Sequence, residues 1–311
     1  MQTETILWIV FAVVIIIMLA LDLGVFNKKA HVIRVKEALI WSGIWISIGM
    51  LFFVGIYFFL DNELGLQYLA TYLIEKSLSM DNIFVFFLLF SYFNLPAENQ
   101  HKVLFWGILG ALFFRGIFIW AGAAIILQFH WVIYIMSVFL IYTGIKLLVK
   151  KERKMNPEKM FAVRMLKKIF PVSDKYYKDK FFINMDKHTH ATMLFVTLVA
   201  VEFTDIIFAV DSIPAALSIS QDPFIVFTSN VFAIMGLRSL YFVLAGVIDK
   251  LRFLKFGLCL ILVFIGVKMF LHDIYKISTL FSLGVIVSVL ILSIISSLLI
   301  KEKKNELNYE I

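Results

Sequence analysis

The sequence Glu202-Phe-Thr-Asp205-Ile-Ile-Phe-Ala-Val-Asp211-Ser212-Ile-Pro214 lies inside an apolar run from about residue 189 to 219. A run of that length is enough for a helix that spans a membrane. Carboxylates at such a depth are costly, at roughly 2.5–3.5 kcal/mol each on insertion scales. The stretch therefore predicts a membrane-spanning helix and also a partner, a cavity or an ion that stabilises its acidic side chains.

Pro214 predicts a break in this helix, because an internal proline removes its own donor and displaces the carbonyl four residues back. That carbonyl belongs to the residue before Asp211. Helical phase points the same way: Glu202, Asp205 and Ser212 share one side of a straight helix, whereas Asp211 faces elsewhere. Unwinding near Asp211 would let Asp211 face the same cavity as Glu202 and Asp205, together with the hydroxyl of Ser212 and a free carbonyl.

A second acidic stretch, Glu75-Lys-Ser-Leu-Ser-Met-Asp81-Asn82, lies inside the apolar run 66–94. Glu75, Ser79 and Asn82 form one helical stripe, and Asp81 lies off it. If helical throughout, this run would exceed the roughly 30 Å hydrocarbon core. We therefore expect a tilt or an unwound segment near Asp81, in parallel with the first stretch.

The composition indicates a polytopic all-α membrane protein. Of the 311 residues, 61% are hydrophobic and only 16% are charged, whereas a soluble domain is nearer half apolar and a quarter charged. The single cysteine, Cys259, excludes an internal disulfide and a thiolate metal cluster. We expect one transmembrane domain over residues 1–311.

Nine apolar runs predict nine transmembrane helices, at about 5–26, 37–60, 66–94, 103–123, 128–149, 189–219, 224–248, 253–272 and 279–300. Basic residues gather in the loops 27–36, 150–187 and 249–255 and in the tail after 300, whereas the alternate loops contain only Lys276. Because basic loops stay cytoplasmic, the N-terminus is expected outside and the C-terminus in the cytoplasm.

The spans also suggest an inverted repeat of three-helix units, spans 3–5 at about 64–149 and spans 6–8 at about 188–273. Because spans 3 and 6 cross in opposite directions, the units would be related by an axis in the membrane plane, an arrangement typical of transporters. Three residue pairs occur in the same order in both units: Asp81 with Asp211, Arg115 with Arg238, and Gly144 with Gly266.

The basic cytoplasmic loop 150–187 is the longest segment outside the spans. At helical spacing, basic residues alternate in it with five apolar ones: Phe161, Met165, Leu166, Ile169 and Phe170. This pattern predicts an interfacial helix on the anionic leaflet, unless the charge serves only to set the topology. Contact with membrane lipid is expected, and nucleic-acid binding is not, because nothing folded is predicted there that could hold a base.

Buried basic residues are expected to pair with the buried acids. Lys76, Arg115 and Arg238 are the candidates for supporting ion pairs. Asp22, near the cytoplasmic end of the first span, is a sixth candidate carboxylate or alternatively a capping or snorkelling residue. Six carboxylates against these three cations leave an excess of three negative charges, which falls to one if Lys146 and Lys268 also reach inward.

A net negative interior favours a cation as the bound species. The predicted ligands are carboxylate, amide, hydroxyl and carbonyl oxygens, and this set suits Mg²⁺, Ca²⁺ or Mn²⁺ better than Zn²⁺ or Cu⁺. The candidate ligands are Asp22, Glu75, Asp81, Asn82, Glu202, Asp205, Asp211 and Ser212. No catalytic residue and no prosthetic group is expected.

The two acidic stretches resemble the two signature segments of the TerC family, named for tellurium resistance. The resemblance extends from Asp22 to about Leu271. It implies two inverted three-helix units, a multi-pass location in a bacterial inner membrane, and efflux of Mn²⁺ from the cytoplasm. It carries the metal role onto Glu75, Asp81 and Asn82 of the one stretch, and onto Glu202, Asp205 and Asp211 of the other.

The leading hypothesis is a secondary transporter that exports Mn²⁺ by alternating access, with protons as counter-ions displaced from the acids. Ligand chemistry alone leaves a Ca²⁺ transporter open. A second hypothesis is a non-transporting membrane scaffold that helps partner proteins to insert or to load metal. An intramembrane enzyme is not expected, because HExxH, GxSxG and CxxC motifs are lacking.

Overall fold

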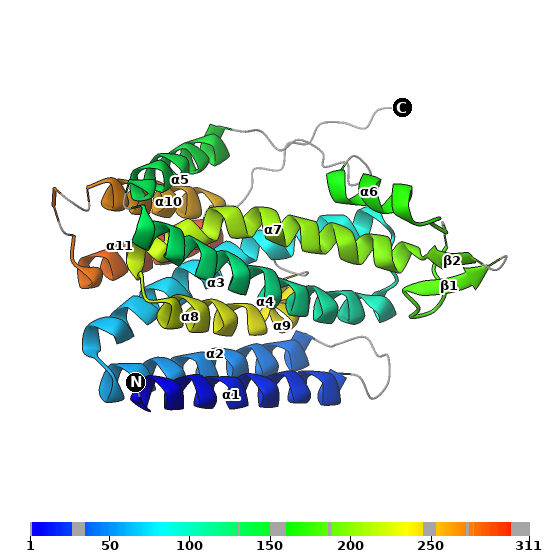
Figure 1. Ribbon diagram of the computed structural model, residues 1–311, viewed down its shortest axis with the longest axis horizontal. Coiled ribbons are helices and arrows are strands. Elements are labelled where there is room, and N and C mark those ends of the chain that lie inside the picture. Colours follow the sequence, from blue (N-terminus) through cyan, green and yellow to red (C-terminus); the bar gives the residue numbers. More distant parts are fainter. Residues whose placement is uncertain are drawn as a thin grey trace.

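The structure is a computed structural model that describes residues 2–26, 35–129, 131–149, 160–173, 175–185, 188–244, 253–271, 274–275 and 277–299. Its elements in chain order are α1 (Gln2–Phe26), α2 (Val35–Phe59), α3 (Asn62–Tyr92), α4 (Ala97–Gln128), α5 (Val132–Val149), α6 (Phe161–Ile169), β1 (Phe182–Met185), β2 (His188–Ala191), α7 (Met193–Ile219), α8 (Pro223–Met235), α9 (Leu237–Leu244), α10 (Leu254–Phe270) and α11 (Thr279–Leu299). The long helices form one bundle, and the small β-hairpin lies at one end of it (Figure 1).

Each predicted apolar run coincides with a helix, or in the case of run 224–248 with the pair α8 and α9. In the described part of the chain, five helical segments are long and apolar enough to cross a membrane: Lys36–Phe59, Ala97–Gln128, Met193–Ile219, Pro223–Val243 and Thr279–Leu299. Three further apolar helices are shorter: Thr5–Leu21, Val132–Lys146 and Phe256–Phe270. The protein is therefore a predominantly helical membrane protein, while the count of nine spans and their orientation stay predictions.

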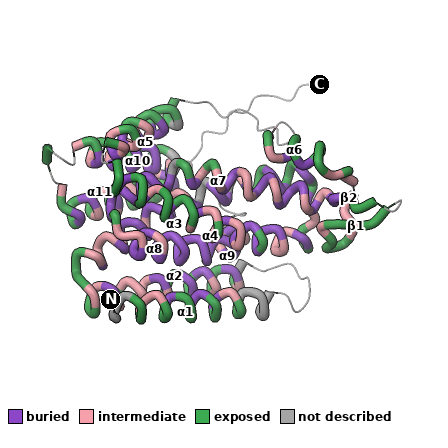
Figure 2. The backbone as a smooth tube through the Cα atoms, viewed as in Figure 1, coloured by how far each residue is buried: buried purple, intermediate pink, exposed green. Residues whose placement is uncertain are grey.

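The centre of the bundle is formed by α3, α7 and α8. Helix α3 packs against α7, α8, α2 and α11, and α7 packs against α4, α3, α10 and α5. The α8–α9 segment is the most enclosed of the five, since 89% of the residues in its most apolar stretch are buried, against 22% in that of α2. Figure 2 shows the same gradient, from buried inner helices to the exposed faces of α1 and α11. Those exposed apolar faces suit contact with lipid.

The two ends of the bundle differ. Helix α6 and the β-hairpin lie at one end, which we call the hairpin end (Figure 1). The start of α1 and the α4–α5 and α7–α8 junctions lie at the opposite end. The described part of the predicted cytoplasmic loop 150–187 thus gathers at a single end of the bundle.

Two of the inner helices begin at aspartate caps at the opposite end. Asp61 Oδ1 accepts hydrogen bonds from the backbone N–H groups of Glu63 and Leu64, at 2.8 and 3.0 Å. Asp222 Oδ1 likewise accepts from the N–H of Phe224, at 2.8 Å. Such caps satisfy donors that have no partner inside the helix, and they fix where α3 and α8 enter the bundle.

The glycines of α5 and α10 pack reciprocally. A Cβ at Gly144 would lie 3.0 Å from the Cys259 carbonyl oxygen and 2.8 Å from Val263, and a Cβ at Gly266 would lie 2.9 Å from the Ser137 carbonyl oxygen and 2.7 Å from Ile141. Small residues let membrane helices approach this closely. The partners are equivalent by position, because each residue in the pairs Gly144–Gly266, Ile141–Val263 and Ser137–Cys259 lies 122 positions from its counterpart.

The predicted helix break at Pro214 is wrong, since α7 is one helix from Met193 to Ile219 with the proline inside it. Helix α3 also continues past Asp81, from Asn62 to Tyr92, so the unwinding expected there is absent as well. The reason is packing: the residues on either side of Pro214 are buried against neighbouring helices. Membrane helices tolerate a proline when their neighbours hold them in this way.

A break does occur in the run 224–248, where the sequence predicted a single span. Helix α8 ends at Met235, Gly236 follows as its cap residue, and α9 begins at Leu237. The φ of Gly236 is −86°, which other residues also adopt. The glycine instead provides space, because a Cβ there would lie 2.9 Å from Lys76 Nζ.

The described part of loop 150–187 contains a helix, as its spacing predicted, and also a hairpin that was not predicted. In α6, Val163 and Leu166 are buried, whereas Phe161, Met165 and Ile169 are exposed. Strands β1 and β2 pair antiparallel. Residues 175–181, which we call the strap, connect α6 and the hairpin to the α3–α4 turn. Tyr176 OH donates to the Phe93 carbonyl at 2.7 Å, and Asn99 Nδ2 donates to the Lys178 carbonyl at 2.9 Å.

Candidate functional site

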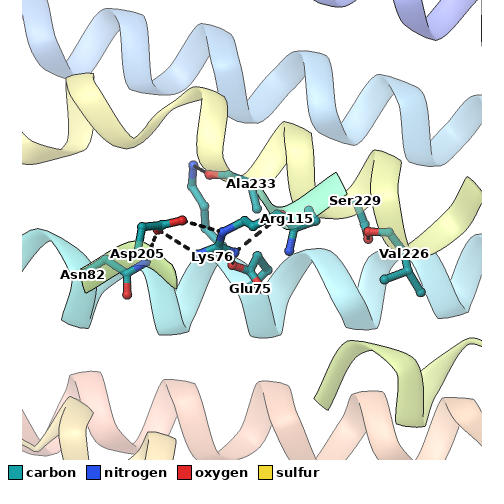
Figure 3. Close-up of polar contacts among 9 residues, drawn as sticks. Glu75, Lys76, Asn82, Arg115, Asp205, Val226, Ser229 and Ala233 are labelled. Atoms are coloured by element: carbon teal, nitrogen blue, oxygen red, sulfur yellow. Dashed lines mark hydrogen bonds and ion pairs between the residues drawn. The ribbon is translucent and has the colours of Figure 1, made fainter. Parts of the chain in front are cut away.

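The acidic stretches of α3 and α7 meet at Arg115 of α4 (Figure 3). Arg115 Nε donates to Asp205 Oδ2 and Arg115 Nη2 donates to Asp205 Oδ1, both at 3.1 Å, which makes a two-pronged ion pair. Arg115 Nη1 donates to Glu75 Oε1. All three residues are at most 3% exposed. One guanidinium therefore joins a carboxylate from each acidic stretch.

Small residues bring Arg115 close to α7. Gly107, Ala111 and Arg115 are spaced by four residues, so they lie on one stripe of α4, and all three are buried. A Cβ at Gly107 would lie 3.0 Å from Val201 of α7. The close approach of the two backbones lets the arginine side chain reach across to Asp205.

Two asparagines lie beside the guanidinium. Asn230 Oδ1 of α8 is 3.5 Å from Arg115 Nη1. Asn82 has two possible amide orientations: in one its Nδ2 donates to Asp205 Oδ1 at 3.4 Å. In the other its oxygen accepts from Arg115 Nη2, and its nitrogen donates to the Leu78 carbonyl, both at 3.2 Å. The second orientation makes more and shorter hydrogen bonds, so we prefer it.

Glu202 lies one helical turn before Asp205 on α7, against Gly110 of α4. A Cβ at Gly110 would collide with both carboxylate oxygens of Glu202. The glycine thus forms a notch that the carboxylate fills. Within the described part of the chain, Glu202 Oε2 is buried without a hydrogen-bond partner. Glu202 is therefore a carboxyl group beside the Arg115 pair but outside it.

Lys76 is held differently from Arg115. Its Nζ donates to the Ala233 carbonyl of α8 at 3.0 Å (Figure 3). Ala233 lies in the last turn of α8, where carbonyls lack partners within the helix and a cation is favourable. Among the described residues, Lys76 makes no ion pair with a carboxylate. Its charge therefore stabilises the interruption at Gly236.

Several buried polar atoms of α3, α7 and α8 have no partner among the described atoms. They are Glu75 Oε2, Ser79 Oγ, Ser212 Oγ and Asn230 Nδ2, and their side chains are at most 3% exposed. A buried polar atom without a partner costs about 1–3 kcal/mol. Three of these four atoms are hard oxygen donors, which is the chemistry that a divalent cation of the Mg²⁺, Ca²⁺ or Mn²⁺ type accepts.

The acids on either side of Arg115 occupy equivalent positions in their stretches. Glu75 precedes Asp81 by six residues, and Asp205 precedes Asp211 by six. Glu75 and Asp205 lie 130 positions apart in the sequence, and so do Asp81 and Asp211. Arg115 thus lies where corresponding points of the two acidic helices come together.

The side chains of three predicted site residues lie outside the described part of the structure. Asp22, Asp81 and Asp211 belong to α1, α3 and α7, but their side chains lie outside the described part of the structure. In the described residues, no three His, Cys, Asp or Glu side chains converge as a metal site. Glu75 and Asp205 do not converge on a shared metal position because the Arg115 guanidinium lies between them.

Two cavities lie towards the two ends of the central helices. The hairpin-end cavity, of about 740 Å³, is lined by residues that include Asn99, Lys102, Tyr176, Asp179 and Arg238. The opposite-end cavity, of about 670 Å³, is lined by residues that include Glu63, Gln67, Ser218, Lys268 and Thr279. The buried ion pair lies between them, because the opposite-end cavity lies at the start of α3 and the end of α7, whereas the hairpin-end cavity lies at the start of α4, well before Arg115.

Sequence reasoning identified the acids and the arginine but missed their supports. The notch at Gly110, the cap at Gly236 and the amide of Asn230 were not predicted. The spacing of Gly107 and Gly110 on α4 was a visible signal of close helix packing. The facing residue, Glu202, could not be read from that spacing, since it belongs to another helix.

Comparisons with known proteins agree with this architecture. The model of the family described as "Integral membrane protein TerC family" matches residues 60–305. The "Uncharacterized membrane protein STKORF319" of Myxococcus xanthus is 48% identical over 94% of this chain and 92% of its own length. The "Putative membrane-bound redox modulator Alx" is 43% identical in Escherichia coli strain K12, over 93% of each chain, and 41% identical in Salmonella typhi, over 96% of each. No solved structure matches this chain.

Proposed function

We propose that this chain, which belongs to the TerC family of integral membrane proteins, is a secondary transporter that exports a divalent cation, with Mn²⁺ as the expected cargo. The observation that carries the proposal is the placement of Glu75 and Asp205. Both acids are buried at equivalent points of two acidic helices, between cavities at opposite ends of the bundle. Ionisable residues inside a membrane usually mark the path of an ion or a proton.

The charge and chemistry of the interior favour a cation. Five carboxylates of α3 and α7 (Glu75, Asp81, Glu202, Asp205, Asp211) against three cations (Lys76, Arg115, Arg238) leave a net charge of −2 when all are ionised. Oxygen donors fit Ca²⁺ as well as Mn²⁺. The preference for Mn²⁺ rests on the resemblance of the two acidic stretches, and the ligand chemistry by itself does not decide it.

Helix pairing supports alternating access by two inverted units. Helix α3 packs on α8 as α7 packs on α4, while α3 with α7 and α5 with α10 pack on each other. A pseudo-two-fold axis that exchanges the units would produce this reciprocal pattern. The matched positions of the α5–α10 glycines agree with it. In transporters of this kind, one unit rocks against the other around a site at the midplane.

Protons are the proposed counter-ions, and Glu202 is the group that we assign to carry one. Its carboxyl is partly buried in the notch at Gly110, and its Oε2 has no hydrogen-bond partner among the described atoms. An isolated carboxylate is unfavourable in such surroundings. Release of that proton when cargo binds would couple the two ions.

The test is Mn²⁺ flux into proteoliposomes that contain the purified protein. Glu75→Gln and Asp205→Asn should each abolish flux, because each removes a charged oxygen ligand. Asp61→Asn is the matched control: it also neutralises an acid, but asparagine still caps α3, so flux should stay at the wild-type rate. Unchanged flux in both site variants would refute the site. Flux that ignores an imposed pH gradient would refute proton antiport but leave export itself standing.

A second candidate function is a scaffold that assists partner proteins without moving ions. The favouring observation is the exposed apolar stripe of α6, formed by Phe161, Met165 and Ile169 beside basic residues. The Alx relatives are named as putative redox modulators. If a redox role in this chain used a thiol, that thiol would be Cys259, which is buried in α10. Changing the three α6 residues to serine should abolish a scaffold function and leave Mn²⁺ flux intact.

A further inference from the structure

We infer that Arg115 is a mobile counter-ion that replaces the cargo in the empty transporter. This inference rests on the proposed function. In the arrangement described here, the guanidinium holds Glu75 and Asp205 together. When a divalent cation binds those carboxylates, Arg115 moves to Glu202. The arginine thereby lets the empty carrier return, and it converts exchange of cargo across the membrane into net export.

The geometry makes Arg115 and the cargo mutually exclusive. Both oxygens of Asp205 accept from Arg115, at 3.1 Å each, and Glu75 Oε1 accepts from Nη1. Of the four oxygens, only Glu75 Oε2 has no partner among the described atoms. A Ca²⁺- or Mn²⁺-like cation needs about six oxygen ligands, so it must displace the guanidinium to bind both acids.

The charge balance explains why the empty transporter needs Arg115. Arginine stays protonated in proteins, so Glu75, Asp205 and Arg115 together carry a charge of −1, whereas the two acids alone would carry −2. Removing one partner of a buried ion pair is strongly destabilising, because the other charge is left buried and uncompensated. Without the arginine, the empty transporter would have to change between its two conformations with two buried carboxylates unpaired.

Glu202 is the natural second partner for the guanidinium. It faces Gly110, which is five residues before Arg115 on α4, and it lies one turn before Asp205 on α7. Long side chains of a helix lean towards its N-terminus, which is the direction of Gly110. With cargo on Glu75 and Asp205, the ionised Glu202 and Arg115 balance each other. The loaded site is then neutral.

The second arginine of the predicted repeat lies in a different place. Arg238 matches Arg115 in the sequence order of the two units, yet it lines the hairpin-end cavity. Lys76 is also buried, but its contact is the Ala233 carbonyl. In the described structure, Arg115 is the cation that bonds to both halves of the proposed site at once.

Two flux assays on the same proteoliposomes test the inference: exchange of Mn²⁺ with Mn²⁺ on the other side, and net export into Mn²⁺-free medium. Exchange does not need the empty carrier to return, whereas net export does. Arg115→Gln should therefore keep exchange within about threefold of wild type and reduce net export by roughly 100-fold, the ratio that corresponds to about 3 kcal/mol. Lys76→Gln is the control, since it removes an equal charge without freeing either acid, and its two rates should change by the same factor.

Arg115→Lys is a second variant that keeps the inference testable if Arg115→Gln fails to fold. It keeps the positive charge and loses only the two-pronged geometry. It should show wild-type exchange with net export between those of wild type and Arg115→Gln. If the arginine variants lose exchange and net export by the same factor, or keep both, Arg115 is a structural residue and the inference is wrong. If wild-type protein carries no Mn²⁺ in either assay, the proposed function itself fails.

Discussion

The carboxylates of Glu75, Asp205 and Glu202 have three different surroundings, and this difference separates their proposed roles. Asp205 gives both oxygens to Arg115, Glu75 gives one, and Glu202 lies in a notch beside them. Titratable groups that sit in contrasting environments usually divide the work of a site. The pairing of Arg115 with an acid could be predicted from the sequence alone, because a buried arginine needs an anion. The choice of Glu75 and Asp205 required the packing of three helices.

Gly110→Ala tests the notch that holds Glu202. A methyl group there would occupy the space of the carboxylate, and overpacking of this kind typically costs 1–3 kcal/mol. We expect a loss of about that size in the free energy of unfolding, measured by denaturant titration in detergent. Gly55→Ala is the control, because nothing lies within 4 Å of its Cβ, and it should be neutral or slightly stabilising.

The double variant Gly110→Ala with Glu202→Ala makes this prediction specific. Removing the carboxylate should relieve the collision, so the two changes should be strongly non-additive. Additive losses would mean that Glu202 does not occupy the notch.

Among the elements, the sequence placed the helices well and their interruptions poorly. Apolar runs decide where a membrane helix lies, and the predicted runs agree with the observed helices. Pro214 is a local signal for a break, but burial on both sides keeps α7 continuous. The interruption at Gly236 coincides with a tertiary contact, since the Lys76 ammonium reaches the last turn of α8 from α3. No pattern within residues 224–248 could have revealed that contact.

The α5–α10 interface provides a symmetric prediction. Gly144→Ala and Gly266→Ala each place a methyl group about 3 Å from a carbonyl oxygen of the other helix, and the backbone cannot move aside as a side chain can. Each change should lower the free energy of unfolding by about 1–3 kcal/mol, and the two losses should be similar. Gly284→Ala has open space around it and should cost nothing. A loss confined to one of the two glycines would contradict the proposed equivalence of the units.

The strap at the hairpin end should contribute stability that is insensitive to pH in the physiological range. Lys102 Nζ is 3.4 Å from Asp179 Oδ2 and lowers the pKa of that carboxyl below its usual range. A lowered pKa means that the contribution is present above the ordinary pKa of 3.8 and is lost only as the pH falls through the lower folded value. Because Asp179 is exposed, the contribution is small.

Tyr176→Phe and Asp179→Asn separate the two anchors of the strap. The tyrosine change removes a hydrogen bond to the Phe93 carbonyl and should lower protection of the strap by about 1 kcal/mol, measured by hydrogen exchange. The aspartate change should have a smaller effect, equal at pH 5 and pH 8. An effect of Asp179→Asn that differs between these two pH values would show that the carboxyl titrates where we expect it to stay ionised.

For the whole molecule, the cavities towards the two ends and the buried charges between them form one system. The start of α4 lines the hairpin-end cavity, the start of α3 and the end of α7 line the opposite-end cavity, and the Glu75–Arg115–Asp205 group lies buried between the two. Sequence patterns predicted the two acidic helices, and their inverted relation stays a prediction. These patterns could not predict that one arginine would bridge an acid of each helix, because its spacing on α4 has meaning only once α4 lies against α7.

The most direct test of the account is equilibrium binding of Mn²⁺ to the purified protein, measured by isothermal titration calorimetry. We predict one saturable site, lost in Glu75→Gln and in Asp205→Asn, and kept in Asp61→Asn. Saturable binding that is unchanged in both site variants, or no binding to the wild-type protein, would contradict the claim that these buried carboxylates hold a divalent cation.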